Sequence, residues 1–111
     1  DFNAAEFEKA KMDEIGLIDE IYPRYRSTYY AHIFSGGYSA GYYVYYWAAV
    51  LDSDAFNYFK ESGDLFNPEL AAKFRQHCLQ ECGNDEGMVQ YKKFRGQEPS
   101  NEPFLKKHGL N

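Results

Sequence analysis

The sequence has little positive charge and no long apolar run. Its 111 residues carry 12 Lys and Arg against 17 Asp and Glu, which gives a formal net charge of −5. Partners such as nucleic acid or an anionic membrane require a concentrated basic surface, so this charge argues against both. The short basic run YKKFR, residues 91–95, does not change that conclusion. No apolar run approaches the roughly 20 residues of a bilayer-spanning helix, so we expect no membrane partner.

Several catalytic motifs are missing as well. The segment GGYSAG is not GxGxxG and no GK[ST] follows it, so we expect no nucleotide site. Ser35 and Ser39 lie near His32, but no nucleophile-elbow pattern surrounds either serine, which argues against a serine hydrolase. There is no HExxH motif and the 3 histidines are scattered, so we predict no metal site in this chain.

Cysteine is scarce, and the 2 cysteines, Cys78 and Cys82, lie in one predicted helix. A bridge between them would close only a short loop and add little stability, so we expect free thiols. Together with His77 they would form only an incomplete metal set. Free thiols permit a reducing compartment without proving one. No signal peptide opens the chain, but the N-terminal part of a longer protein would carry any such signal, so the sequence leaves the compartment open. We favour the cytoplasm, with the periplasm as the alternative.

Helix start and stop signals divide the chain. Asn3 is a predicted N-cap with Glu6 as its capping-box partner, and Asn67 is a predicted cap with Pro68 at the first helical position. Pro23 breaks the helical pattern, and irregular chain is expected from there to about residue 39. The predicted helices cover residues 3–16, 39–63 with a possible break at 52–54, 67–83, 85–96 and 100–109.

These signals predict an all-α fold in a single helical domain, residues 1–111. A chain of this length can bury about two-thirds of its unfolded surface in one core. The chain lacks an initiator Met and begins abruptly at DFNAAEF. We therefore expect a piece of a longer protein, although processing would leave the same start.

Aromatic residues, by contrast, are abundant in this sequence, and 11 of them are Tyr. If residues 38–51 form one helix, Tyr38, Tyr42 and Tyr45 fall on one face, beside the flexible glycines Gly36 and Gly37. Hydroxyl groups gathered there could donate to a substrate oxygen, although tyrosines at this spacing often only pack. The opposite face is predicted to be ordinary core and contains Tyr43, Trp47, Val50 and Leu51.

Three segments carry a family resemblance that composition does not supply. YRSTYYAHIFSGGYSAGYY, FRGQEPS and the terminal KKHGLN are similar to the C-terminal end of the thimet-oligopeptidase family of zinc metallopeptidases, above all to its peptidyl-dipeptidase branch. The resemblance covers essentially all 111 residues. It implies that the chain is a multi-helix part of the C-terminal catalytic lobe of a two-lobed, zincin-like enzyme.

The resemblance also implies where the zinc lies. In the family, an HExxH helix and a further glutamate hold the metal upstream of this region, so the chain would contain no cofactor and the parent protein would contain zinc. The expected partners are short peptide substrates, admitted through a deep channel, and the remainder of the parent catalytic domain. By itself the chain is predicted to be inactive.

By motif position, the resemblance assigns roles to individual residues. His32 would hydrogen-bond the substrate backbone near the scissile bond, and Tyr38 would approach the substrate from the glycine loop. Tyr45 would be catalytic, donating its hydroxyl to the oxyanion of the tetrahedral intermediate. Tyr42 shares the same face and is a further candidate for substrate binding.

Gly36 and Gly37 would let the loop close over a peptide. The expected activity of the parent is hydrolysis of short peptides, with release of C-terminal dipeptides favoured over internal cleavage. The alternative is a non-catalytic helical domain that binds peptides or has a structural role. RNA binding through stacked tyrosines is a weaker alternative because the chain is acidic.

Overall fold

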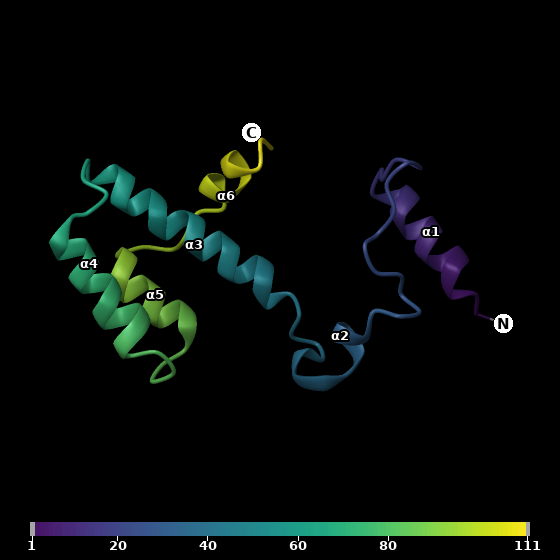
Figure 1. Cartoon of the computed structure of the whole chain (residues 1–111), viewed down its shortest axis with the longest axis horizontal. Helices are drawn as coiled ribbons and strands as arrows, with labels where there is room; N and C mark the ends of the chain where they lie inside the picture. Colours follow the sequence, from purple (N-terminus) through teal and green to yellow (C-terminus); the bar gives the residue numbers. More distant parts are fainter. Residues whose placement is uncertain (1, 111) are drawn as a thin grey trace. The chain divides into compact units, whose positions relative to one another are not determined.

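The computed structural model describes residues 2 to 110, and these residues form helices joined by turns and loops (Figure 1). Within this range there is no strand, which confirms the all-α prediction. The elements are α1 (Ala4–Glu14), α2 (Ala31–Phe34), the 3-10 helix η1 (Gly36–Tyr38), α3 (Val44–Glu61), α4 (Pro68–Phe74), the π-helix η2 (Arg75–Gln80), α5 (Gly87–Arg95) and α6 (Glu102–Lys107).

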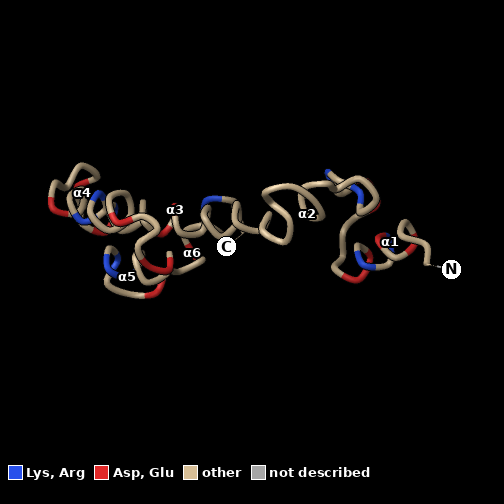
Figure 2. Tube along the Cα trace, turned by 90° about the horizontal axis from the view of Figure 1, so that it is seen from below, with Lys and Arg blue, Asp and Glu red and all other residues tan. Residues whose placement is uncertain are grey.

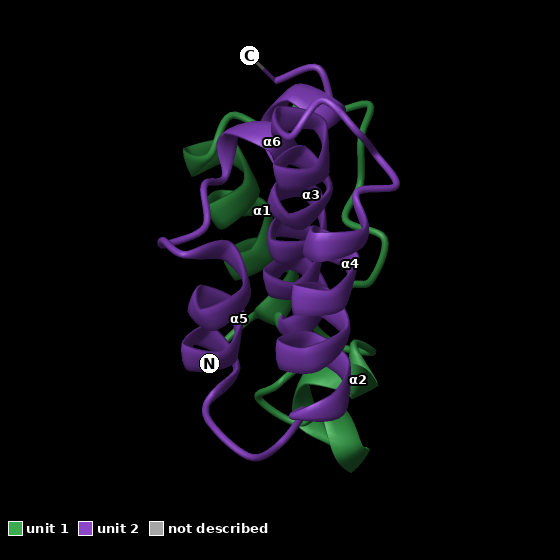
Figure 3. Ribbon diagram, turned by 90° about the vertical axis from the view of Figure 1, so that its left-hand side faces the viewer, with its two compact units in different colours: residues 1–43 green, residues 44–111 purple. Residues whose placement is uncertain are grey.

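The chain divides into two compact units, the first ending at Tyr43 and the second beginning at Val44 (Figure 3). The first unit contains α1, α2 and η1, and the second contains the remaining helices. The assignment of the whole chain to one domain stays a prediction. No helix within residues 2–110 has both the length and the apolar character needed to cross a membrane.

Helix α1 begins and ends where its local signals predict. The side chain of Asn3 accepts hydrogen bonds from the backbone N–H groups of Ala5, at 3.1 Å, and Glu6, at 3.3 Å. At the other end, Gly16 adopts a left-handed φ of 76°, a conformation that glycine tolerates without a steric penalty. The predicted cap and stop of this helix are confirmed.

A buried carboxylate ties α1 to the loop that follows it. Glu8 is only 7% exposed and accepts from the guanidinium of Arg26 at 2.8 Å and from the backbone and hydroxyl of Ser27 at 2.7 and 2.9 Å. The hydrogen bond from Arg26, followed by those from Ser27, lowers the pKa of Glu8 to about 2. The loop at residues 26–27 is therefore fixed to the middle of α1.

The predicted helix over residues 39–63 starts too early. Ser39 has an extended ψ of 126° and Ala40 has a positive φ of 54°, and neither conformation fits an α-helix. Residues 39–43 form turns, and α3 begins only at Val44. The preceding chain is not wholly irregular either, because α2 and η1 lie within residues 31–38.

The possible break at residues 52–54 does not occur, because α3 is continuous there. Ser53 donates its hydroxyl hydrogen bond to the carbonyl of Ala49, one turn back, at 2.8 Å. Asp54 is 1% exposed and faces partners from other segments of the unit. These two polar residues are thus satisfied within a helix and do not end it.

The predicted helix over residues 67–83 changes its winding partway. Asn67 caps α4 by accepting from the backbone N–H groups of Glu69 and Leu70, as predicted, and Pro68 occupies the first turn. After Phe74 the chain continues as the π-helix η2. Gly83 follows with a left-handed φ of 86°.

The last two helices end at glycines, as predicted. Gly96 and Gly109 have left-handed φ values of 81° and 69°. Helix α6 begins slightly later than predicted, at Glu102, whose backbone N–H donates to the hydroxyl of Ser100 at 3.1 Å. Helix α6 packs on α3, while α5 packs on η2 and α4.

The second unit has a small core with a charged network beside it. Phe94, 1% exposed, lies at the centre of aromatic contacts with Tyr58, Phe74 and Tyr91. Burial, together with the hydrogen bond to Asp54, raises the pKa of Tyr91 well above its usual range. This core joins α3, α4 and α5.

The carboxylate of Asp54 organises that network. It accepts from the Tyr91 hydroxyl at 2.6 Å, from Nε of Arg95 at 3.1 Å and from the backbone N–H of Ser100 at 3.3 Å. A second guanidinium nitrogen of Arg95 lies 3.0 Å from a carboxylate oxygen of Glu61. The network therefore connects α3 with α5 and with the segment that leads into α6.

The predicted core face of α3 is wrong in part. Tyr43, which precedes the helix, is 70% exposed and Trp47 is 40% exposed, whereas Val50 and Leu51 are half-buried. The later start of the helix removes only Tyr43 from the predicted face, because Trp47, Val50 and Leu51 all lie on α3. Trp47 is a large apolar side chain left on the surface of this chain.

Candidate functional site

The segment that carries the predicted site has no charged side chains of the Asp, Glu, Lys or Arg type. Residues 27–51 contain none of these four, although charged residues flank the segment on both sides. Figure 2 shows this as a tan stretch of trace around α2, without blue or red. Hydrogen-bonding groups in this segment are therefore supplied by the backbone, by serine, threonine and tyrosine hydroxyls, by the Trp47 indole and by His32.

The six predicted site residues lie on consecutive elements of the chain. His32 lies in α2, Gly36 and Gly37 begin η1, Tyr38 ends it, Tyr42 lies in the following turn, and Tyr45 is the second residue of α3. Five of them belong to the first unit and one, Tyr45, to the second. Tyr38 and Tyr42 therefore do not share a helix with Tyr45, and the predicted helix face is wrong.

Within the first unit, the structure nevertheless brings His32, Tyr38 and Tyr42 together. The ring centroids of His32 and Tyr42 are 4.9 Å apart, and those of Tyr38 and Tyr42 are 5.7 Å apart in an edge-to-face arrangement. His32 and Tyr38 complete the triangle at 6.4 Å. The Tyr38–Tyr42 pair has the edge-to-face geometry that aromatic rings favour, and the imidazole of His32 is tilted by 43° and 45° against the rings of Tyr42 and Tyr38.

Two tyrosines that the sequence reasoning did not single out join this group. Tyr25 stacks on Tyr30 at 4.8 Å with an interplanar angle of 19°, and its ring also lies 5.7 Å from His32. Tyr30 meets His32 at 6.2 Å and the edge of Tyr42 at 5.4 Å. We call these five residues, Tyr25, Tyr30, His32, Tyr38 and Tyr42, the aromatic cluster.

Burial differs within the aromatic cluster. Tyr25, Tyr30 and Tyr42 are half-buried, whereas His32 and Tyr38 are exposed, Tyr38 to 43%. The half-buried rings thus form the base and the exposed rings the accessible part. No periodic pattern in the sequence predicted that Tyr25 and Tyr30 belong to this cluster, although both lie in the segment that carries the family resemblance.

The two adjacent glycines differ in what their positions require. Gly36 has a left-handed φ of 73°, whereas Gly37 has an ordinary backbone conformation, and a Cβ at either position would meet no heavy atom within 4 Å. Ser39 closes the turn, because its hydroxyl and its N–H donate to the carbonyl of Gly36 at 3.0 and 3.2 Å. The loop needs glycine at the first position only.

Tyr45 lies on α3 of the second unit, with 54% of its surface exposed. Its ring is accessible from solvent in this chain. Its predicted role in catalysis stays a prediction.

The described residues contain no group of three or more His, Cys, Asp or Glu side chains placed to hold a metal ion. His77 instead pairs with Glu81 at 3.1 Å, and that hydrogen bond is the main reason that the pKa of Glu81 is lowered. Cys78 and Cys82 are free thiols, as predicted. Burial, and then the neighbouring Cys82, raises the pKa of the Cys78 thiol. Residues 2–110 therefore offer no fit for the zinc that the resemblance implies.

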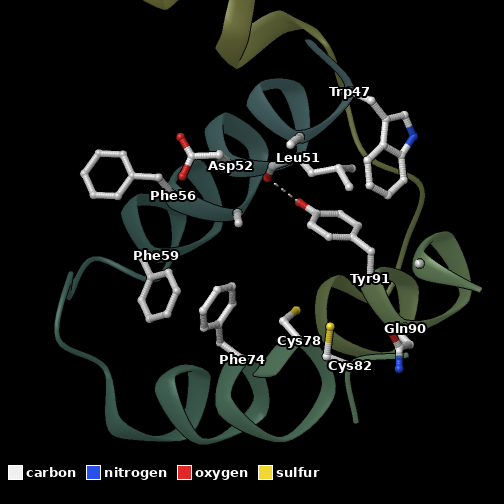
Figure 4. Close-up of a pocket in the computed structure, with 13 residues that line it drawn as sticks. Trp47, Leu51, Asp52, Phe56, Phe59, Phe74, Cys78, Cys82, Gln90 and Tyr91 are labelled. Carbon is white, nitrogen blue, oxygen red and sulfur yellow. Dashed lines mark hydrogen bonds between the residues drawn. The ribbon is translucent and has the colours of Figure 1, made fainter. Parts of the chain in front are cut away.

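The second unit contains an apolar pocket of about 470 Å³ that is separate from all six predicted site residues. Figure 4 shows the rings of Phe59, Phe74 and Tyr91 and the sulfur of Cys78 pointing toward the same hollow. Its wall is mostly carbon and sulfur, and Trp47 lies at its edge. A pocket of this composition can take apolar side chains but offers little catalytic chemistry.

Residues 2–110 contain helices and no strand, which agrees with the all-α class that the resemblance implies. Comparison with known proteins names the family: the model of peptidase family M3 matches residues 2–110. The chain therefore belongs to peptidase family M3. This confirms the predicted resemblance to the thimet-oligopeptidase family.

Curated relatives agree with the family match. The chain is 46% identical over 90 residues to a dipeptidyl carboxypeptidase of Escherichia coli K12, in a match that covers 80% of this chain and 13% of that protein. It is 39% identical over 110 residues to the dipeptidyl carboxypeptidase of Salmonella typhimurium, covering 98% of this chain and 16% of the relative. Oligopeptidase A of Escherichia coli K12 is 46% identical over 81 residues, in a match that covers 73% of this chain and 12% of that protein. The chain thus spans less than a fifth of the length of these relatives.

Proposed function

We propose that this chain forms part of the substrate-binding wall of a larger zinc metallopeptidase that hydrolyses short peptides. Membership of peptidase family M3 supports peptide hydrolysis. Two of the relatives carry the name dipeptidyl carboxypeptidase, which favours release of C-terminal dipeptides as the reaction. In the parent protein the wall consists of the loop from α2 to Tyr42 and the first turn of α3.

The observation that carries this proposal is the aromatic cluster, whose members other than Tyr25 all lie in the uncharged segment of residues 27–51. His32 and Tyr38 are exposed, and each has a polar group that can hydrogen-bond a peptide backbone. Tyr42, at 4.9 Å from the histidine ring, supports both from the half-buried side. A neutral wall of this kind suits the amide groups of a peptide, which carry no net charge.

Tyr45 has the catalytic role in this proposal. Its phenol donates a hydrogen bond to the oxyanion that forms when water attacks the scissile carbonyl. A preorganised donor of this type is worth about 3 kcal/mol of the activation barrier, because it binds charge that exists only in the transition state. A leucine at this position could pack but could not donate.

The zinc belongs to the rest of the parent protein in this proposal, since the described residues present no ligand set for it. When bound, zinc activates a water molecule for attack. The residues of this chain bind and orient the peptide and hold one proton, that of the Tyr45 hydroxyl, toward the developing charge. The isolated chain is accordingly expected to hydrolyse nothing.

The partner of the second unit is the remainder of the parent catalytic domain. The apolar pocket and exposed side chains such as Phe56, at 54%, and Phe66, at 89%, form a surface that a soluble protein normally covers. The relatives are about six times as long as this chain, because matches of 110 and 81 residues cover only 16% and 12% of them. For the location we favour the cytoplasm, with no nucleic-acid or membrane partner.

Steady-state kinetics of the full-length protein on short peptides tests the proposal. Tyr45→Phe should lower kcat about 100- to 1,000-fold with little change in KM, because only the transition state loses a donor. Tyr46→Phe is the matched control: Tyr46 is the next residue of the helix, is 74% exposed and should tolerate loss of its hydroxyl. Equal kcat values for the two variants would contradict the role of Tyr45.

Two further measurements separate this proposal from a non-catalytic peptide-binding domain. The isolated chain is mixed with short peptides and added zinc, and turnover that a chelator abolishes would show that the chain is itself an enzyme. The full-length protein is then titrated with peptides while tyrosine and tryptophan fluorescence is followed. Binding without any hydrolysis would favour the peptide-binding alternative.

A further inference from the structure

The position of His32 raises a physical question that the proposed function leaves open. His32 lies on α2, a helix of only 4 residues, and its side chain is exposed. An exposed side chain on a short element samples several rotamers, and a substrate-binding group must be held in one of them. Something in the surrounding structure has to restrict the imidazole.

Tyr25 comes from a different segment and meets that ring. Its centroid lies 5.7 Å from His32 with an interplanar angle of 47°. Tyr25 in turn contacts two further groups, the stacked ring of Tyr30 at 4.8 Å and the guanidinium of Arg24, 5.4 Å from the ring centroid. These contacts restrict the Tyr25 ring, so that it can support its neighbour.

The segment that carries Tyr25 is anchored to α1. The next two residues, Arg26 and Ser27, donate three hydrogen bonds to the carboxylate of Glu8, at 2.7 to 2.9 Å. Glu8 is 7% exposed and lies in the middle of α1. A continuous path of contacts thus leads from α1 through Glu8 and Tyr25 to the histidine ring.

We propose that Tyr25 is a positioning residue, which holds the imidazole of His32 in its substrate-facing orientation and is itself fixed through the Glu8 anchor. The inference rests on the proposed function, because it assumes that His32 contacts the substrate. It assigns a role to a residue that makes no contact with substrate of its own. The aromatic ring of Tyr25 matters for this role, and its hydroxyl does not.

The experiment is a double-mutant cycle in the full-length protein, with kcat/KM for a short peptide as the readout. Tyr25→Leu should lower kcat/KM about tenfold, because a misplaced binding group loses much of its effect. In the His32→Gln background the same substitution should change kcat/KM less than twofold, since the group it positions is gone. Tyr25→Phe keeps the ring and should restore the wild-type value.

Tyr29→Leu is the matched control, because Tyr29 lies in the same loop, is 59% exposed and belongs to none of the ring pairs of the aromatic cluster. Glu8→Gln provides a second route if Tyr25→Leu does not fold. It leaves every ring in place, loosens the anchor, and should lower kcat/KM only when His32 is present.

The outcomes distinguish the inference from the proposed function. Equal losses from Tyr25→Leu with and without His32, or no loss at all, would overturn the positioning role of Tyr25 while leaving the substrate role of His32 intact. If His32→Gln alone leaves kcat/KM unchanged, the substrate role of His32 is wrong and the inference falls with it. A loss seen only when His32 is present would support both.

Discussion

Replacing Asp54 by alanine is the sharpest test of how the second unit is held together. The Asp54 side chain is 1% exposed and accepts from the Tyr91 hydroxyl, from Nε of Arg95 and from the backbone of Ser100. Alanine removes all three acceptor contacts at once. It also leaves the guanidinium of Arg95, whose side chain is 8% exposed, without its principal counter-charge.

The expected loss is large for a single substitution. Removing one partner of a buried ion pair costs about 3–5 kcal/mol, mostly because the other charge is left buried. Glu61 still contacts Arg95 at 3.0 Å, and its side chain is 48% exposed, so it offsets part of that cost. We therefore expect about 3 kcal/mol, against a total of about 5–15 kcal/mol for a typical domain.

Urea unfolding of the 111-residue chain, followed by far-ultraviolet circular dichroism, measures this change. Asp52→Ala is the matched control, because Asp52 lies on the same helix, is 73% exposed and pairs with Lys107 only at 3.7 Å. An exposed pair of this kind is worth at most about 1 kcal/mol. If the two variants differ by less than about 1 kcal/mol, the Asp54 network does not stabilise the fold and the reasoning is wrong.

Three further predictions concern the first unit, the glycine loop and the thiols. The pKa of Glu8 is lowered from 4.5 to about 2, so its stabilising effect is complete above pH 4.5 and is lost as the pH falls toward 2. Urea unfolding at several pH values should show this dependence in the wild type and lose it in Glu8→Gln. Gly36→Ala should lower the free energy of unfolding by about 1 kcal/mol, because the φ of Gly36 is 73°. Gly37→Ala should leave that free energy unchanged or raise it slightly, and a clear loss of stability in Gly37→Ala would argue against this loop geometry. A maleimide reagent at pH 8 should modify the exposed Cys82 before Cys78, whose thiol pKa is raised. Mass spectrometry of single Cys→Ser variants measures the two rates, and faster modification of Cys78 would contradict this prediction.

The helix ends were predictable because their causes are local. Asn3 and Asn67 cap the backbone within three residues of themselves, and Gly96 ends its helix through its own φ of 81°. A short window of sequence contains all the atoms involved in such a cap. The family resemblance was also readable from short segments, and it was confirmed by a match over residues 2–110.

The predictions that were wrong concern features that depend on contacts between residues far apart in the sequence. The apparent break at residues 52–54 reads as polar and helix-ending, yet Asp54 is buried against Arg95, 41 positions later in the chain. The aromatic run before α3 reads as one helix with two faces, but Ala40 adopts a positive φ and the helix begins afterwards. Pattern alone could not show that Tyr25 would stack against the site segment.

The sequence by itself determined the helical class, the caps and stops, the absence of a charged residue between positions 27 and 51, and the family to which the chain belongs. Tertiary structure alone decided which tyrosines surround His32 and which acidic residues are buried. The physical reason is the separation along the sequence over which each kind of interaction acts. Backbone preferences and caps act over a few residues, whereas ring packing and buried ion pairs depend on segments that meet only when the chain has folded.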